Sequence, residues 1–212
     1  MRRPRVILAD DHKIVTEGLK SLLEPEFELV GIVEEGRALL AAAEKLRPDV
    51  IEADISMPLL NGIDSVRQIK KAHDEIKVVF LTMHPDVTYA VSAFEAGASG
   101  YVLKHSAPTE LVTAIRSALR GKTFVTPLLA GEFMQRTKER ATQRDESTRL
   151  TERQCEILQL LAEGKSAKEI ATVLNISSRT VEFHKYRIMK DLGLKSAAEL
   201  IHYAVRHGII TK

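Results

Sequence analysis

Hydrophobic positions in the first 105 residues gather into short continuous runs separated by longer amphipathic segments. The runs are 5–9 (RVILA), 27–33 (FELVGIV), 49–54 (DVIEAD), 77–82 (KVVFLT) and 100–103 (GYVL). The segments between and after them place apolar residues three and four positions apart, which predicts helices over 12–24, 36–46, 62–73, 87–96 and 107–120. Continuous apolar strands alternating with helices are typical of a parallel sheet covered on both faces. We therefore expect an α/β domain with a five-stranded, doubly wound parallel sheet.

The pattern changes to helices alone after Leu150. A first helix is expected to begin at the cap residue Thr151 and to end at Gly164, and a short second helix to begin at Ser166. The segment SSRTVEFHKYRIMKDLGL follows a tight turn, and a last helix is expected from Ser196. Two short helices joined by a tight turn, the second of them basic, indicate a helix-turn-helix in a small all-α domain.

A polar segment separates these two parts. Residues 136–149 (RTKERATQRDESTR) contain one alanine and no larger apolar residue, which is typical of a solvated linker. The preceding segment FVTPLLAGEFM is apolar enough to pack against either domain. We predict an α/β domain at 4–121, a linker at 122–147 and a helical domain at 148–212.

Charge is divided unevenly between the two parts. Residues 1–120 hold 15 Lys and Arg against 18 Asp and Glu, whereas residues 149–212 hold 11 against 7. A polyanionic partner would therefore meet the C-terminal part. The chain has no apolar run of about 18 residues, and its single cysteine, Cys155, fits a reducing compartment. We expect a cytoplasmic protein that has no membrane partner.

Charged and hydroxyl side chains follow the predicted strands. Asp10 and Asp11 follow the first strand, Asp54 and Thr82 end the third and fourth, and Lys104 follows the fifth. Carboxyl ends of parallel strands meet at one edge of a sheet, where functional crevices lie. Three carboxylates brought together there raise one another's pKa values unless a cation neutralises them, and Mg²⁺ suits oxygen ligands. With a lysine and a hydroxyl added, the site could hold a phosphoryl group while a carboxylate attacks phosphorus.

Residues 4–121 resemble the receiver domain of two-component response regulators, which has a flavodoxin-like fold. The segments that carry the resemblance are ILADDH (7–12), ADISMPLLNG (53–62), VFLTMH (79–84) and AFEAGASGYVLKHS (93–106). The resemblance implies that Asp54 accepts a phosphoryl group from a sensor histidine kinase. It further implies that Asp11, Asp54 and the Ser56 carbonyl bind Mg²⁺ directly, and that Asp10 acts through water.

The same resemblance implies roles for residues around the acids. Lys104 would pair with the phosphate, and Thr82 with Tyr101 would form the switch pair that moves after phosphorylation. Ser56 and His84 would tune the lifetime of the acyl phosphate. His105 stands where many receivers carry proline, and Glu52 where the family has an aliphatic residue. Because Cα52 lies roughly 6.6 Å below Cα54 on the same face, we expect Glu52 to lower stability and to leave the acidic pocket intact.

The basic helix of the C-terminal part can be divided into faces. Val181, Ile188 and Leu192 form its expected buried stripe. In a major groove, Phe183 could contact a thymine methyl, while Tyr186 and Glu182 could meet base edges. The alternative for the two aromatic residues is packing against a neighbouring helix, and His184 is expected to be structural. The candidate DNA-contacting residues are Lys165, Lys168, Arg179, Thr180, Glu182, Phe183, Lys185, Tyr186 and Lys190.

Residues 148–212 resemble the LuxR-type helix-turn-helix domain through LTERQCEILQLLAEGKSAKEIA, ISSRTVEFHKYRIMKDLG and AAELIHYA. Joined to a receiver in this order, the domain is typical of NarL/FixJ-type response regulators. The resemblance implies a non-enzymatic, phosphorylation-dependent bacterial transcription regulator that binds promoter DNA and forms a homodimer when phosphorylated, with RNA polymerase as a further partner.

Two other classes of protein compete with this interpretation. A phosphatase with an aspartyl-phosphate intermediate, of the haloacid-dehalogenase type, would place a second acid two residues after the nucleophile, where this chain has Ser56. A DNA-binding protein with an inactive receiver would have a broken acidic pocket, whereas all five pocket residues are present. We therefore expect the phosphorylation-dependent regulator.

Overall fold

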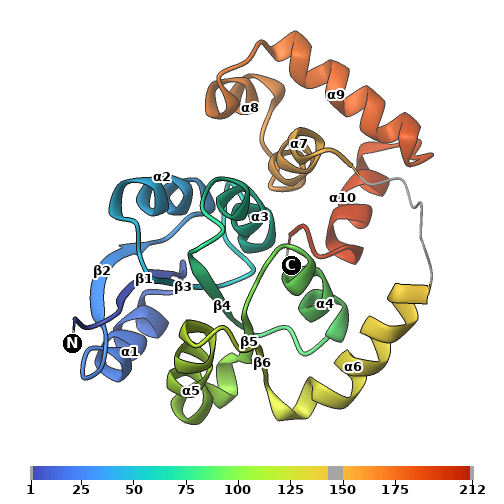
Figure 1. Ribbon diagram of the computed structural model, residues 1–212. Coiled ribbons are helices and arrows are strands. Elements are labelled where there is room, and N and C mark those ends of the chain that lie inside the picture. The colour runs from blue at the N-terminus through green and yellow to red at the C-terminus, as the bar shows by residue number, and fades with distance from the viewer. Residues whose placement is uncertain (1, 143–149, 211–212) are drawn as a thin grey trace. The chain divides into compact units, whose positions relative to one another are not determined.

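The computed structural model describes residues 2–142 and 150–210, which form two compact units. The N-terminal unit is an α/β sandwich and the C-terminal unit is helical (Figure 1). Each unit is described by itself.

Six parallel strands form the sheet of the N-terminal unit in the order β2-β1-β3-β4-β5-β6. The strands are β1 (Arg5–Ala9), β2 (Glu28–Val33), β3 (Val50–Ala53), β4 (Lys77–Thr82), β5 (Gly100–Leu103) and β6 (Phe124–Val125). The first five match the predicted runs, and their order is the flavodoxin-like one. The predicted fold class is therefore confirmed in all but the number of strands.

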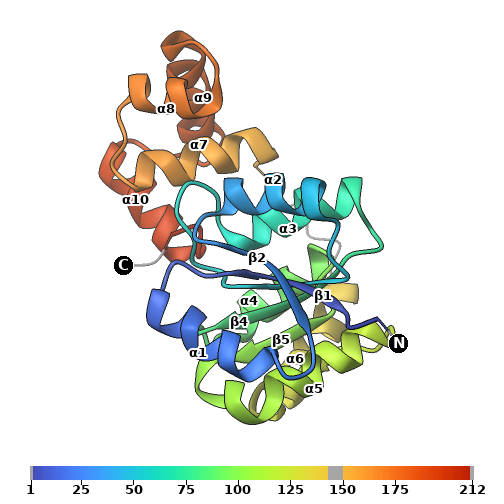
Figure 2. The same cartoon turned by 90° about the vertical axis from the view of Figure 1, so that its left-hand side faces the viewer.

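Alternation along each strand sends apolar side chains to two separate cores. Ile7, Ile51 and Phe80 belong to the core beneath α2 (Gly36–Leu46), α3 (Gly62–Ala72) and α4 (Val87–Glu95). Leu8, Val79 and Leu81 belong to the opposite core, beneath α1 (Lys13–Leu23) and α5 (Ala107–Leu119). Figure 2 shows the two layers of helices on either side of the sheet. Each buried Leu or Ile side chain contributes about 1.5–3 kcal/mol, so both faces hold the sheet in register.

The prediction of five strands was wrong, because residues placed in the linker add a sixth. Phe124 and Val125 pair with Gly100 and Tyr101 of β5, after α5 has crossed over the sheet. The following helix α6 (Pro127–Thr142) packs on α4, where the ring centroids of Phe94 and Phe133 lie 4.8 Å apart. The apolar segment FVTPLLAGEFM thus packs with the α/β unit, while the expected linker residues 143–147 lie outside the described residues.

Four helices make up the described part of the C-terminal unit: α7 (Glu152–Ala162), α8 (Ala167–Leu174), α9 (Ser178–Asp191) and α10 (Ala197–Arg206). Thr151, Ser166 and Ser196 cap three of them, as the sequence predicts. Gly164 ends the first at φ 83°, a backbone conformation that favours glycine. Ile157, Ile170 and Val181 meet in one core, which fixes α8 and α9 against α7.

Candidate metal-binding pocket and nucleic-acid interface

The ends of β1, β3 and β5 bring Asp10, Asp54 and Lys104 into contact. The backbone N–H of Asp54 donates to the Ala9 carbonyl oxygen at 2.8 Å, which extends the pairing of β1 with β3 by one residue. The Lys104 ammonium lies 2.7 Å from Asp10 Oδ2 and 2.6 Å from Asp54 Oδ2. All three side chains are largely buried, so these charges interact in a region of low dielectric.

The other oxygen of Asp54 is held by the loop that follows β3. Asp54 Oδ1 accepts hydrogen bonds from the backbone N–H groups of Ile55 at 2.7 Å and Ser56 at 3.4 Å. Gly62 allows this loop to close, because a Cβ there would lie 2.0 Å from the Asp54 carbonyl oxygen. The carboxylate is therefore fixed in orientation before any ligand arrives.

Charge and burial oppose each other in this pocket. Burial raises the pKa of Asp54, the Lys104 ammonium opposes that rise, and Asp10 adds to it. Burial alone would lower the pKa of Lys104, but the charge of Asp54 and hydrogen bonds to Asp10 and Asp54 raise it overall. One ammonium thus faces two carboxylates, which leaves an excess of negative charge for a further cation.

The donor atoms in the pocket fit a divalent metal ion. Asp10, Asp11, His12 and Asp54 each offer one ligand atom, and these atoms lie within 4.8 Å of one another. Asp11 is exposed at the rim, whereas Asp10 is fully buried. Asp10 Oδ2 is paired with the Lys104 ammonium at 2.7 Å, and Asp10 Oδ1 accepts from the His12 backbone N–H at 2.9 Å. Carboxylate oxygens are the ligands that a hard divalent cation prefers. The grouping of the three aspartates at strand ends agrees with the sequence prediction, whereas the membership of His12 was not predicted.

Thr82 and Tyr101 both bond to the backbone of His84, in the loop between β4 and α4. Thr82 Oγ1 accepts from the His84 N–H at 3.2 Å, and the Tyr101 hydroxyl donates to the His84 carbonyl oxygen at 2.8 Å. The Tyr101 ring is fully buried, and burial raises the pKa of its hydroxyl. The two residues are thus linked through one loop segment.

The side chain of His84 reaches back over the acceptor loop. Its Nε2 lies 2.9 Å from Ser56 Oγ, and its ring stacks on Tyr89 of α4 with centroids 4.3 Å apart. Burial lowers the pKa of His84. Ser56 and His84, which the resemblance placed beside the site, are therefore in contact with each other.

Glu52 lies on the same face of β3 as Asp54 but deeper. In the sheet it is the neighbour of Leu8 and Val79, in the core under α1 and α5. It is fully buried, and neither carboxylate oxygen makes a hydrogen bond of ordinary geometry within the described residues. Burial, Asp10 and Asp54 raise its pKa well above the ordinary value, against weaker lowering by Lys104 and by the backbone of Ala9. Glu52 is not one of the four residues that group as possible metal ligands.

An N-terminal cap and buried side chains hold α9 in the C-terminal unit. Ser177 caps the helix by accepting from the Thr180 N–H, and Val181 and Ile188 are fully buried while Leu192 packs at the edge of the core. Phe183 and Tyr186 are 56% and 67% exposed, so no helix among residues 2–142 and 150–210 covers these aromatic rings. His184, the residue after Phe183, is half-buried.

The remaining candidate residues for DNA contact differ in their exposure. Arg179, Glu182 and Lys190 of α9 and Lys168 of α8 are exposed, whereas Lys165 and Lys185 are half-buried. The Thr180 hydroxyl lies 2.8 Å from Ser177 Oγ and is used in the helix cap. Arg187 was not selected from the sequence, yet it is exposed and its guanidinium lies 5.9 Å from the centre of the Phe183 ring. Its position four residues after Phe183 was the available signal.

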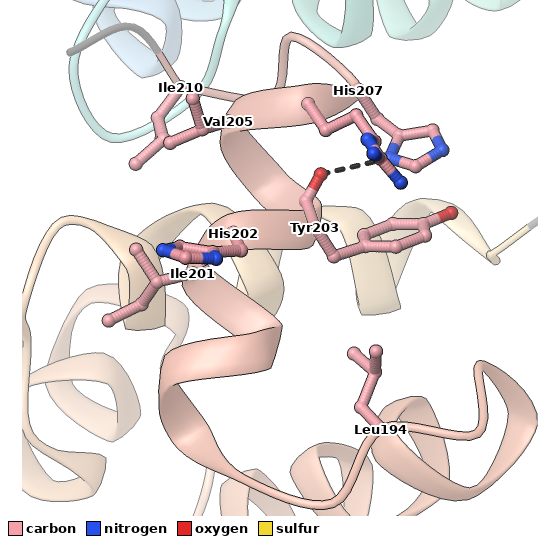
Figure 3. Close-up of a pocket in the computed structure, with 8 residues that line it drawn as sticks. Leu194, Ile201, His202, Tyr203, Val205, His207 and Ile210 are labelled. Atoms are coloured by element: carbon pink, nitrogen blue, oxygen red, sulfur yellow. Dashed lines mark hydrogen bonds between the residues drawn. The ribbon is translucent and has the colours of Figure 1, made fainter.

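A separate hollow lies on α10 and its flanking segments. Figure 3 shows that Ile201 and His202 lie on one side of the helix and Tyr203 and His207 on the other. The rings of Tyr203 and His207 stack with centroids 3.8 Å apart, and His207 Nδ1 lies 2.9 Å from the Tyr203 carbonyl oxygen. None of the lining residues belongs to α9, so the hollow is distinct from the exposed α9 face.

Known proteins match both parts of the chain. Residues 6–116 match the response regulator receiver domain family, and residues 148–204 match the luxR family of bacterial regulatory proteins. Within the described residues no helix has the length and apolarity to cross a membrane.

Two curated relatives match over nearly their whole lengths. The transcriptional regulatory protein MctR of Rhizobium johnstonii is 37% identical, over 98% of this chain and 96% of that protein. The oxygen regulatory protein NreC of Staphylococcus carnosus is 34% identical, over 97% of this chain and 99% of that protein.

Solved structures of a response regulator also match nearly the whole chain. The RcsB response regulator of Salmonella typhimurium is 31% identical with a TM-score of 0.65, and the match covers 98% of this chain and 99% of that one. RcsB in complex with DNA is 30% identical with a TM-score of 0.59, over 95% of this chain and 98% of that one. With a receiver followed by a LuxR-type DNA-binding domain, the chain belongs to the two-component response regulators of the NarL/FixJ type and is a DNA-binding transcription regulator.

Proposed function

We propose that Asp54 is the phosphoacceptor of this regulator and that its phosphorylation controls promoter binding by the C-terminal unit. The observation that carries the proposal is the contact of Lys104 with both Asp54 and Asp10, 2.6 and 2.7 Å from their Oδ2 atoms. An Asp54 oxygen attacks phosphorus, the bond from phosphorus to the donor breaks, and the donor leaves as the free imidazole of a sensor histidine kinase. The loop N–H groups and Lys104 hold the nucleophile in place during this step.

Mg²⁺ is the cofactor in this proposal. Asp11, Asp54 and the Ser56 carbonyl would hold the ion directly, and Asp10 would hold it through water. When bound, the ion offsets the negative charge of the phosphoryl oxygens and of the carboxylates. The excess of carboxylate charge over Lys104 supports this assignment.

Thr82 and Tyr101 form the switch in this proposal. A phosphoryl group on Asp54 would attract both the Lys104 ammonium and the Thr82 hydroxyl. Turning the hydroxyl would break its bond with the His84 N–H, and Tyr101 is bonded to the carbonyl of the same residue. The β4–α4 loop would then move, and the new arrangement would be favoured only while the phosphate is present.

The output is binding of a homodimer to double-stranded promoter DNA, followed by contact with RNA polymerase. RcsB structures include two dimers bound to two parallel DNAs, which supports a dimer that reads two half-sites. We assign the receiver to 4–121 together with β6 and α6 of the segment 122–147, and the DNA-binding domain to 148–212. We place the regulator in the bacterial cytoplasm with its promoter.

Contacts with DNA fall into two groups in this proposal. Exposed Glu182, Phe183 and Tyr186 on α9 would read base edges and thymine methyl groups. The basic side chains, the Thr180 hydroxyl and the helix N-terminus would contact phosphates. The basic residues are Lys165, Lys168, Arg179, Lys185 and Lys190.

Intact-mass spectrometry tests the acceptor directly. The full chain is incubated with acetyl phosphate and Mg²⁺, and the Asp54→Asn variant is treated in the same way. The wild-type chain is expected to gain the mass of one phosphoryl group and the variant to gain none. Failure of the wild-type chain to gain mass would contradict the proposal and would favour a regulator controlled by ligand or partner binding.

A further inference from the structure

Arg187 lies on the exposed face of α9, about one helical turn after Phe183. Its guanidinium carbon lies 5.9 Å from the centre of the Phe183 ring, which is within the range of a cation–π contact. Residues four positions apart share one face of a helix, so the two side chains project in the same direction. Both side chains are exposed. The pair therefore offers an aromatic ring and a cation together to the ligand of this face.

The Phe183 ring also contacts His184. The two ring centroids lie 5.8 Å apart at an interplanar angle of 72°, which is an edge-to-face arrangement. His184 is half-buried, so its ring is less free to move than a ring directed wholly to solvent. Contacts thus run in series from His184 through Phe183 to Arg187. They restrict the orientations of the guanidinium before DNA arrives, and a restricted side chain loses less entropy on binding.

The charge of Arg187 is not taken up by an acid of the same helix. The two acids of α9 face other residues: Glu182 lies 3.9 Å from Lys185, and Asp191 accepts from Gln154 at 3.4 Å. Within residues 2–142 and 150–210, no carboxylate forms an ion pair with the Arg187 guanidinium. A guanidinium carries five N–H donors in a planar fork. These donors are therefore available to a ligand that offers paired acceptors.

We propose that Arg187 reads a guanine in the major groove and that Phe183 holds it beside the thymine methyl group that the ring contacts. The inference rests on the proposed function, in which α9 reads base edges. The fork of an arginine matches the O6 and N7 acceptors of guanine, whereas adenine presents one acceptor and one donor there. The 5.9 Å between guanidinium and ring is shorter than two base steps of about 3.4 Å each. The guanine should therefore lie within two base pairs of the thymine.

The test uses the acetyl-phosphate-treated full chain and a library of random-sequence duplexes. Sequencing of the enriched duplexes gives the base preference at each position for the wild-type chain, Arg187→Ala and Phe183→Ala. Arg179→Ala is the matched control, because Arg179 is an exposed arginine of the same helix that is assigned to phosphates. In a second measurement, 7-deazaguanine replaces the guanine of the enriched site, which removes the N7 acceptor and keeps base pairing.

We expect the wild-type site to hold a guanine within two base pairs of a thymine. The preference for that guanine should fall about fivefold in Arg187→Ala, the lower end of the range for a bidentate base contact. 7-Deazaguanine should weaken binding by the wild-type chain by a similar factor and should not weaken binding by Arg187→Ala further. Phe183→Ala should lose the thymine preference and part of the guanine preference, while Arg179→Ala should weaken binding to all sequences and keep both preferences.

The possible failures of this inference and of the proposed function can be told apart. A guanine preference that survives in Arg187→Ala, or equal affinity of the wild-type chain for guanine and 7-deazaguanine, would overturn the role of Arg187. The assignment of α9 to base readout would stand if Phe183→Ala still lost the thymine preference. Base preferences that stay unchanged in both variants, or a wild-type chain that enriches no sequence, would overturn both the role of Arg187 and that assignment.

Discussion

Charged side chains in the acidic pocket contact one another, whereas those on α9 are directed largely to solvent. The Lys104 ammonium lies 2.7 Å from Asp10 and 2.6 Å from Asp54, and the three side chains are largely buried. On α9 the aromatic rings of Phe183 and Tyr186 are exposed, and the nearest ion pair, between Lys185 and Glu182, spans 3.9 Å. The Lys104 ammonium is paired within the chain, whereas Phe183 and Tyr186 on α9 are exposed to solvent. Single substitutions in the pocket should therefore change stability or phosphorylation strongly. Single substitutions on α9 should change DNA affinity weakly and in a salt-dependent way.

Gly62→Ala should have the largest effect. The new Cβ would lie 2.0 Å from the Asp54 carbonyl oxygen, which is backbone and cannot move aside cheaply. We expect a loss of about 3 kcal/mol or more in the free energy of unfolding and loss of phosphorylation. Chemical denaturation and intact-mass measurement after acetyl phosphate treatment check these outcomes.

Gly18→Ala is the matched control for this variant. Gly18 lies within α1, where an added Cβ meets nothing within 4 Å. It should gain about 0.5–1 kcal/mol, the usual difference between alanine and glycine within a helix. Equal stability of Gly62→Ala and the wild-type chain would show that the loop does not depend on this close approach.

Glu52→Val should raise stability and leave the pocket working. The buried carboxyl group of Glu52 makes no hydrogen bond of ordinary geometry, so its removal should gain about 2 kcal/mol at pH 7. Because the folded state raises the pKa of Glu52 above its ordinary value of 4.5, the folded chain holds a proton that the unfolded chain loses. The wild-type chain therefore loses stability as pH rises above about 4.5, until the folded-state pKa is passed, and the variant lacks that loss.

Denaturation curves across pH, together with phosphorylation rates at saturating Mg²⁺, test the role of Glu52. Glu28→Val is the control, since Glu28 is an exposed strand residue whose replacement should change stability by about 0.5 kcal/mol or less. A changed phosphorylation rate in Glu52→Val without a change in stability would assign Glu52 to the chemistry of Asp54.

Lys185→Ala should have the smallest effect. Loss of one phosphate contact should weaken binding to all DNA sequences alike and reduce the slope of log affinity against log salt by about 0.9. Lys45→Ala, an exposed lysine of α2 on the receiver, should change neither quantity. An unchanged salt slope in Lys185→Ala would remove Lys185 from the phosphate contacts.

The grouping of the pocket residues could be predicted from the sequence, because the ends of the strands can be recognised there. Asp10, Asp54 and Lys104 each follow an apolar run, and parallel pairing brings such residues together without further information. The buried stripe of α9 was equally visible, since Val181 and Ile188 lie seven residues apart.

Features that depend on tertiary packing were harder to predict. Strand β6 has only two residues, so it carries no periodicity, and its pairing with β5 depends on where α5 ends. His12 resembles an ordinary rim residue until the distances from Nδ1 to Asp10 and Asp11 are known. Glu52 was recognised as unusual, but its lack of hydrogen bonds among the described residues required coordinates.

The central claim is that phosphorylation of Asp54 controls DNA binding by the C-terminal unit. Duplexes enriched from a random-sequence library by the acetyl-phosphate-treated chain supply a binding site, and fluorescence anisotropy then gives affinities with and without acetyl phosphate and Mg²⁺. We predict that treatment tightens binding by the wild-type chain about tenfold, a typical coupling between two sites, and leaves Asp54→Asn unchanged. Equal affinity of the treated and untreated wild-type chain, or an equal gain in Asp54→Asn, would contradict the account.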